Sequence, residues 1–149
     1  MRTRGFTFIE VLIVMVLIGI IAALGIPRIR DAIQKNNVHA ARAALGTLVT
    51  KARAAAVQRG CKSAIHFSSG SNGYVWVTAC KVSNSALTDT LGGIEQLAAR
   101  YSVTLTAGAD SVTFMPNGVS PDNVLTLLKV TASGISDSVM INQVGKVVR

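Results

Sequence analysis

Residues 5–27 decide the fold, and they read GFTFIEVLIVMVLIGIIAALGIP. Thr7 and Glu10 carry the only polar side chains in this stretch. The 21 residues between its first glycine and its proline would extend about 31 Å as an α-helix, enough to cross the hydrocarbon core of a bilayer. Because Arg2 and Arg4 precede it, the positive-inside rule predicts that the N-terminus stays in the cytoplasm and the rest lies outside.

An ordinary secretory signal explains this stretch poorly. Such a signal is cleaved at small residues that follow the apolar run, and Gly25-Ile26-Pro27 is an unfavourable site. A plain signal anchor is the serious alternative, and Glu10 argues against it. A carboxylate within an apolar span costs on the order of 2.5–3.5 kcal/mol, so it is rarely found there without a partner.

The charge of the chain is strongly basic and unevenly distributed. The formal charge is +8, and without Arg2 and Arg4 the chain keeps 13 basic and 7 acidic residues. Eight of the basic residues fall between Arg28 and Lys62, where Asp31 is the one acid. Such a band suits anionic lipid, nucleic acid or acidic partner subunits. The alternative is a solvated helix face without a partner.

Cys61 and Cys80 are the only cysteines, and their spacing is not that of a metal site. If the head is exported, a single disulfide is the natural interpretation. The alternative is two buried free thiols in a reducing compartment.

Residues 28–58 are alanine-rich and contain no proline, so they are expected to continue the helix beyond a kink at Pro27. At 100° per residue, small and apolar side chains lie on one face of this helix. Four cations lie on another face, within about 20° of a single line along the helix. The apolar residues are Ala41, Ala44, Leu45, Leu48, Ala52 and Ala55, and the cations are Arg28, Lys35, Arg42 and Arg53. The apolar face is expected to pack on a globular head.

Gly60 is expected to end the helix, after which the pattern changes to period two. One ambiguous segment, residues 84–100, is expected to be a loop with one helical turn. The predicted strands are Lys62–Phe67, Tyr74–Cys80, Tyr101–Thr106, Ser111–Met115, Val124–Val130, 138–142 and 144–148, the last two joined by a turn near Gln143. A long helix followed by strands predicts an α+β fold.

The N-terminal residues Gly5-Phe6-Thr7-Phe8-Ile9-Glu10-Val11-Leu12 resemble the class III signal of type IV pilins and type II secretion pseudopilins. The resemblance implies that a prepilin peptidase cuts after Gly5 and that Phe6 is then N-methylated. It also assigns assembly roles to Glu10, Gly19 and Pro27. After cleavage, the Phe6 amine would lie one helical turn from Glu10, so the two charges could neutralise each other within one subunit. Alternatively, Glu10 could pair with the Phe6 amine of a neighbouring subunit and fix the register of a filament, and the family resemblance favours this second arrangement.

The head is similar to the FimT/FimU and GspH family of minor pilins and pseudopilins. The similarity lies in Val112-Thr113-Phe114-Met115-Pro116-Asn117-Gly118, which is like an F-x-P-x-G turn, and in Val144-Gly145-Lys146-Val147-Val148. It implies the type IV pilin fold, a long N-terminal helix packed on an antiparallel β-sheet head. The implied parts are a leader (1–5), a transmembrane helix (6–26), its amphipathic continuation (27–60) and a periplasmic or extracellular head (61–149).

Three functions follow from these patterns. The first is a minor pilin in a type IV pilus, with other pilins, the prepilin peptidase and the inner membrane as partners. The second is DNA binding during DNA uptake, since some FimT-like proteins use a C-terminal G-R-x-R motif. Here Lys146 takes its first basic position, whereas Val148 takes the second and Arg149 is displaced by one, so Lys146 and Arg149 would face opposite sides of a strand. Arg42 and Arg53 form a second candidate patch. The third function is a GspH-type pseudopilin of type II secretion.

An enzyme is the least favoured class. His39 and His66 are better explained as solvated or packed side chains, and no Ser/His/Asp, Cys/His or paired-carboxylate arrangement is evident. No cofactor or metal is expected.

Overall fold

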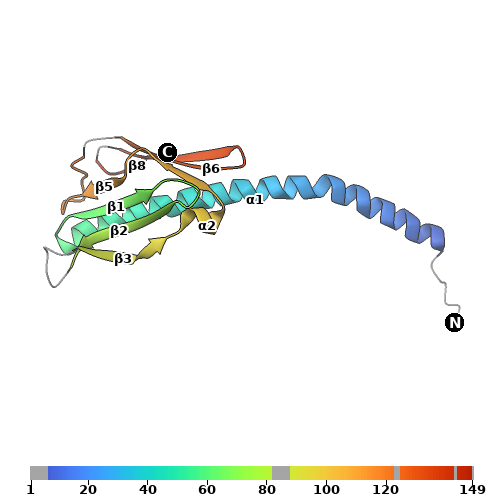
Figure 1. The fold of residues 1–149 in the computed structure, drawn as a ribbon, viewed down its shortest axis with the longest axis horizontal. Helices are drawn as coiled ribbons and strands as arrows, with labels where there is room; N and C mark the ends of the chain where they lie inside the picture. The colour runs from blue at the N-terminus through green and yellow to red at the C-terminus, as the bar shows by residue number, and fades with distance from the viewer. Residues whose placement is uncertain (1–6, 82–87, 123–124, 143, 149) are drawn as a thin grey trace. The chain divides into compact units, whose positions relative to one another are not determined.

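The computed structural model describes residues 7–81, 88–122, 125–142 and 144–148. Its first element is the helix α1, Phe8–Arg59 (Figure 1). The chain divides into two compact units, Met1–Gln34 and Lys35–Arg149. α1 continues through Pro27, so this proline does not end the helix, in agreement with the prediction.

α1 ends where the sequence predicts. Gly60 follows Arg59 with a φ of +63°, a left-handed conformation that glycine adopts without a steric penalty. Just beyond it, the buried Ser63 hydroxyl donates a hydrogen bond to the Ala52 carbonyl over 2.6 Å. The first strand therefore begins directly against the last turns of the helix.

Within the described residues, the strands form two four-stranded antiparallel sheets rather than one continuous sheet (Figure 1). The first has the order β3-β2-β1-β5 and the second β4-β6-β7-β8. The strands of the first are β3 (Thr88–Glu95), β2 (Tyr74–Cys80), β1 (Ser63–Ser68) and β5 (Ser111–Phe114). Those of the second are β4 (Thr104–Ala107), β6 (Thr126–Ala132), β7 (Ile135–Ile141) and β8 (Val147–Val148).

The core of the second unit lies between α1 and both sheets. Alternating strand residues, such as Ile65 and Phe67 on β1 and Leu128 and Val130 on β6, point into it. The helix supplies a buried stripe that includes most of the predicted face: Val38, Ala41, Leu45, Val49, Ala52, Ala55 and Ala56 are buried, with Ala44 and Leu48 partly so. The predicted α+β pilin fold is confirmed, and the small alanines let both sheets approach the helix closely.

The segment before β4 differs from the prediction. Residues 88–95 form the strand β3, which the sequence analysis missed, and Leu97–Tyr101 form the expected single helical turn, α2. Tyr101 ends this helix instead of beginning a strand, because Ser102 takes a left-handed conformation with φ of 52° and delays β4 until Thr104.

The ends of four other predicted strands also shift. β1 begins and ends one residue later than predicted, β5 stops one residue earlier, β6 extends to Ala132, and β7 begins at Ile135. The final strand is only Val147–Val148, because a turn occupies the residues before it. Val124 and Gln143 lie outside the described residues.

Candidate assembly and nucleic-acid interfaces

The processing residues Gly5 and Phe6 lie outside the described part of the chain, which begins at Thr7. The Thr7 hydroxyl accepts a hydrogen bond from the Glu10 backbone N–H over 3.4 Å, and the Thr7 carbonyl accepts from the same group over 3.1 Å. Thr7 and Glu10 thus have the spacing of a capping box at the start of α1. The Glu10 side chain is exposed in the first turn, where the helix dipole favours a negative charge.

The first unit exposes almost its whole apolar surface. α1 is long and apolar enough to cross a membrane, and none of its most apolar window is buried by the rest of the described chain. Gly19 is exposed, with no other atom near the position of a β-carbon, and Pro27 is exposed within the helix. In water this surface is strongly unfavourable, so lipid or the helices of other subunits must cover it.

Cys61 and Cys80 form a disulfide, with their α-carbons 6.3 Å apart. The bond joins the end of α1 to the end of β2, as the export interpretation predicts. Arg59 donates a hydrogen bond to the Cys80 carbonyl and lies 3.9 Å from the Asp89 carboxylate. The C-terminal end of the helix is therefore fastened to two strands of the first sheet.

Arg42 is part of a charged cluster within the head and is not a free phosphate ligand. It donates to the Asp137 carboxylate on β7 over 3.2 Å, and His39 lies 3.0 Å from the same oxygen. Burial alone would raise the pKa of the Asp137 carboxyl, but the Ser138 backbone N–H, His39 and Arg42 stabilise the charged form and hold its pKa below the ordinary value. The proposed role of Arg42 in binding DNA is thus weakened.

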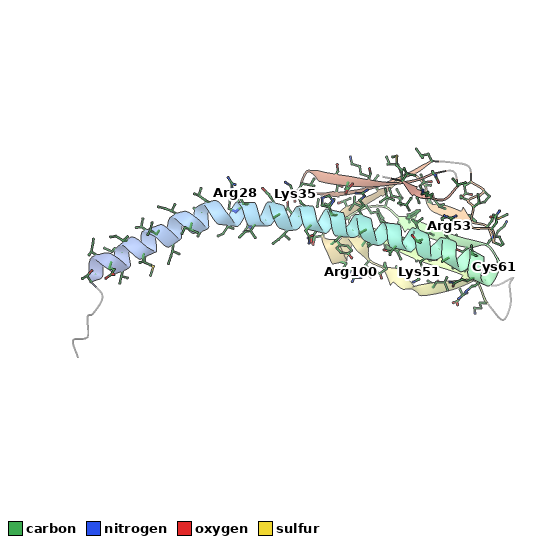
Figure 2. The ribbon with its side chains drawn as sticks, turned by 180° about the vertical axis from the view of Figure 1, so that it is seen from behind. Arg28, Lys35, Lys51, Arg53, Cys61 and Arg100 are labelled. Carbon is green, nitrogen blue, oxygen red and sulfur yellow. A yellow bond between two sulfur atoms is a disulfide. The ribbon has the colours of Figure 1, made fainter. Side chains whose placement is uncertain are left out.

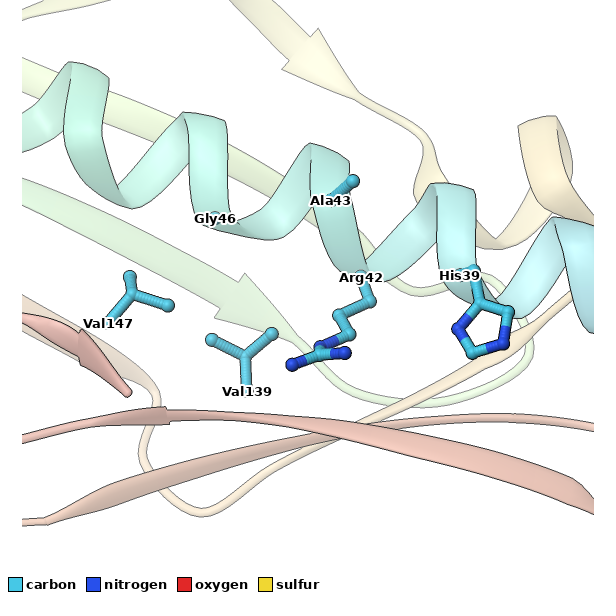
Figure 3. Close-up of a pocket in the computed structure, with 6 residues that line it drawn as sticks. All are labelled: His39, Arg42, Ala43, Gly46, Val139 and Val147. Atoms are coloured by element: carbon cyan, nitrogen blue, oxygen red, sulfur yellow. The ribbon is translucent and has the colours of Figure 1, made fainter. Parts of the chain in front are cut away.

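A hollow of about 350 Å³ lies beside this cluster, between α1 and the strands β7 and β8. Figure 3 shows Arg42 and His39 on the helix side and Val139 and Val147 on the strand side. Gly46 gives it a bare section of helix backbone. The hollow is open and is lined by both polar and apolar side chains.

Arg53 lies near the turn at residues 116–120, and so does the glycine that precedes Lys146. A β-carbon on Gly118 would lie 3.2 Å from Arg53 Nε, and one on Gly145 would lie 3.5 Å from the Ser120 backbone nitrogen. Arg53 and Gly145, the residue before Lys146, thus both lie close to the turn at 116–120. Both cations are exposed, whereas Arg149 lies outside the described residues.

His66 is a packed side chain. Its ring stacks on Trp76 with the centroids 4.9 Å apart, and one nitrogen lies 2.9 Å from the Thr78 hydroxyl. Burial lowers the pKa of His66, so the ring is neutral near pH 7. Within the described ranges, no three His, Cys, Asp or Glu side chains are placed to hold a metal ion.

Sequence reasoning missed two of these roles. Asp137 has no local signal, because its partners are on a helix almost 100 residues earlier. Thr7, by contrast, had a readable signal, since threonine followed three residues later by glutamate before an apolar run is a recognised helix start.

Two family models match the chain. The prokaryotic N-terminal methylation motif matches residues 1–26, and the type II transport protein GspH matches residues 41–145, well over half of the chain. No curated protein matches the sequence.

Two solved structures resemble the fold, and both are crystal structures of the type IV minor pilin FimU from Pseudomonas aeruginosa strain PAO1. The first has a TM-score of 0.60 and 15% identity, and it covers 76% of this chain and 88% of that chain. The second has a TM-score of 0.54, also at 15% identity, and covers 74% and 90%. At this identity the similarity is one of fold.

Proposed function

The chain belongs to the GspH family of type II transport proteins, and on that premise we propose that it is a minor subunit of a type IV pilus. In this role it is held in the inner membrane by one helix, with its head in the periplasm, until it assembles with other pilins. The filament then places the head at the cell surface.

The uncovered apolar half of α1 is the observation that carries this proposal. A membrane anchor needs an apolar surface but gains nothing from Glu10 within it. A filament needs both the apolar surface and the carboxylate, because the same helix must leave the lipid and pack against other helices in a fixed register. A carboxylate that is satisfied in only one axial position would supply that register, at the cost of leaving misaligned subunits with unpaired charges.

The N-terminal sequence supports a specific processing route. A prepilin peptidase would cut after Gly5, and N-methylation of Phe6 would follow. The new amine of one subunit would then pair with Glu10 of its neighbour. The match of the methylation motif to residues 1–26 favours this route.

DNA binding is a finer part of the proposal. Lys146 and Arg53 are both exposed, so each is accessible to the phosphates of a duplex. Lys146 belongs to the tail, which does not depend on the helix surface that neighbouring subunits would cover. We therefore place the primary contact at Lys146, with Arg149, three residues later in the tail, as a second contact.

A pseudopilin of the type II secretion system is the second candidate. The observation that favours it is the family model itself, which describes a type II transport protein. A pseudopilin would have the same anchor and head, but its short filament would remain in the periplasm.

Shearing of surface filaments and deletion of the gene together distinguish a pilus subunit from a pseudopilin. For a pilus subunit, antibody against the head should detect the protein in filaments sheared from the cell surface, and deletion of its gene should reduce piliation while export of secreted enzymes continues. Absence from sheared filaments, combined with loss of enzyme export on deletion, would assign the protein to secretion. A deletion strain with both functions intact would contradict both assignments.

A further inference from the structure

The strand β3 is a long sheet edge that nothing in the described chain covers. We propose that an extended, acidic segment of a different pilin subunit adds to this edge as a further strand of the first sheet. The inference rests on the proposed function, because it names the kind of neighbour that the head meets during assembly.

β3 differs from the other outer strands of the two sheets. It has 8 residues, whereas β5 and β4 have 4 each and β8 has 2. An edge strand leaves a row of backbone N–H and C=O groups without partners, and proteins usually protect such an edge with short strands, lysine or proline. β3 contains neither lysine nor proline, and its Ile94 side chain is 60% exposed. Its own protection is limited to two acidic side chains, Asp89 and Glu95, and to a register shift in its pairing with β2.

A groove runs beside this strand. One hollow of about 440 Å³ is lined by the last turns of α1 together with Leu91 and Gly92 of β3. A second, of about 330 Å³, is lined by α1 with Glu95 and Arg100. Lys51 lines both hollows, so they meet at its side chain (Figure 2 labels Lys51 and Arg100).

The length of the groove suits a strand. Its helix side extends from Ala44 to Arg59, which is about 22 Å at the rise of an α-helix. An extended segment of seven residues covers about 23 Å. The occupant is therefore a segment of about seven residues, close to the length of β3 itself.

Two glycines open the middle of the edge. Gly92 and Gly93 both have positive φ, +79° and +83°, at a point where the pairing of β3 with β2 shifts register. The absence of a side chain at Gly92 lets the Lys51 ammonium lie over the strand, in space that a β-carbon would occupy. The groove thus holds a cation at its centre.

The charges in the groove select an acidic occupant. Arg100 pairs with Glu95 over 3.2 Å, and Arg59 lies 3.9 Å from Asp89. Among the described residues, no carboxylate lies within 4.0 Å of Lys51. An acidic side chain on the incoming strand would provide that partner.

A second copy of this chain is a poor occupant. Residues 35–149 contain 11 basic and 5 acidic residues, a net charge of +6, so two heads repel each other. In addition, two β3 strands paired antiparallel about Gly92 would place Asp89 of each copy directly opposite Glu95 of the other, and like charges in that position are destabilising. The geometry thus favours a different, acidic subunit.

Photo-crosslinking in intact cells tests the proposal with the full-length chain. A photoreactive amino acid at Thr90 on β3 is compared with one at Thr104 on the short edge β4, and adducts are identified by mass spectrometry in both the membrane and the sheared-filament fractions. We expect Thr90, and not Thr104, to capture an acidic segment of another subunit. Lys51→Glu should reduce that adduct by at least about tenfold, since a like charge now faces the acid, whereas Lys129→Glu on the other sheet should leave it unchanged.

The outcomes separate the two claims. If Thr90 forms an adduct in membranes but this chain is never found in sheared filaments, the edge proposal holds and the pilus assignment is contradicted. A protein present in filaments without any Thr90 adduct in either fraction would contradict the edge proposal alone. Capture of a second copy of this chain, or an adduct insensitive to Lys51→Glu in a variant that melts like wild type, would also overturn it.

Discussion

Arg42 on α1 donates a hydrogen bond to the Asp137 carboxylate on β7 over 3.2 Å, across 95 positions of sequence. The contact joins the long helix to the second sheet, and His39 adds a second interaction from the next helical turn. Arg42, which the sequence offers as one candidate DNA contact, thus pairs with an acid inside the head.

Replacing Asp137 with asparagine should lower the free energy of unfolding of the head by about 1 kcal/mol at pH 7. The pKa of Asp137 is lowered by folding, so its contribution is complete above the ordinary carboxyl pKa near 3.8 and is lost as the pH falls through the folded value. Urea unfolding should therefore show the stability gap between wild type and Asp137→Asn narrowing as the pH falls below the ordinary carboxyl pKa. Asp110→Asn, an exposed control, should follow wild type throughout, and a constant gap between Asp137→Asn and wild type down to pH 2 would contradict the ion pair.

The disulfide should contribute substantially to the stability of the head. It closes a loop with a sequence separation of 19, for which chain entropy gives about 3 kcal/mol. Cys80→Ser should lower the melting temperature, and reduced wild type should melt at nearly the same temperature as the variant. Peptide maps should show one 61–80 link that disappears on reduction. Equal melting of oxidised and reduced protein would exclude a stabilising role.

Glu10→Val should separate membrane insertion from assembly. The variant keeps an apolar helix, so it should insert and be processed, but it should be depleted from sheared filaments because the register contact is missing. Met15→Val, an apolar exchange on the same exposed helix, is the matched control and should incorporate normally. Normal incorporation of Glu10→Val would remove the register argument.

If the head binds DNA, the contacts should be mainly with phosphates. Gel shifts with residues 28–149 should then be independent of sequence and weaken steeply with salt. Lys146→Ala combined with Arg149→Ala should abolish the shift, while Arg42→Ala should leave it, because Arg42 is already paired with Asp137. A shift that survives the tail variant but is lost in Arg53→Ala would move the site to the helix, and no shift at low salt would leave only the structural role.

Local patterns explain why much of the fold could be predicted. Gly60 could be assigned to the helix end because a left-handed residue is needed there, and it has a φ of +63°. The strand Tyr74–Cys80 was predicted at its observed limits because Val75, Val77 and Ala79 alternate with more exposed residues. In each case a single residue, or one face of a single strand, is enough to predict the limits of the element.

The remaining features depend on distant parts of the chain. β3 was missed because Thr88–Glu95 has two adjacent glycines and is exposed on both faces, so no alternation marks it as a strand. Only its pairing with β2 makes it one. The Arg42–Asp137 contact likewise depends on tertiary packing, which no spacing in the sequence records.

The mass of the chain recovered from sheared filaments shows whether the protein is a processed filament subunit. A processed filament subunit should begin at Phe6, carry an N-terminal methyl group and lack residues 1–5. A bulky residue in place of Gly5 should leave Met1 in place and keep the protein in the membrane. An intact Met1 on the wild-type chain, in cells with an active prepilin peptidase, would contradict the account.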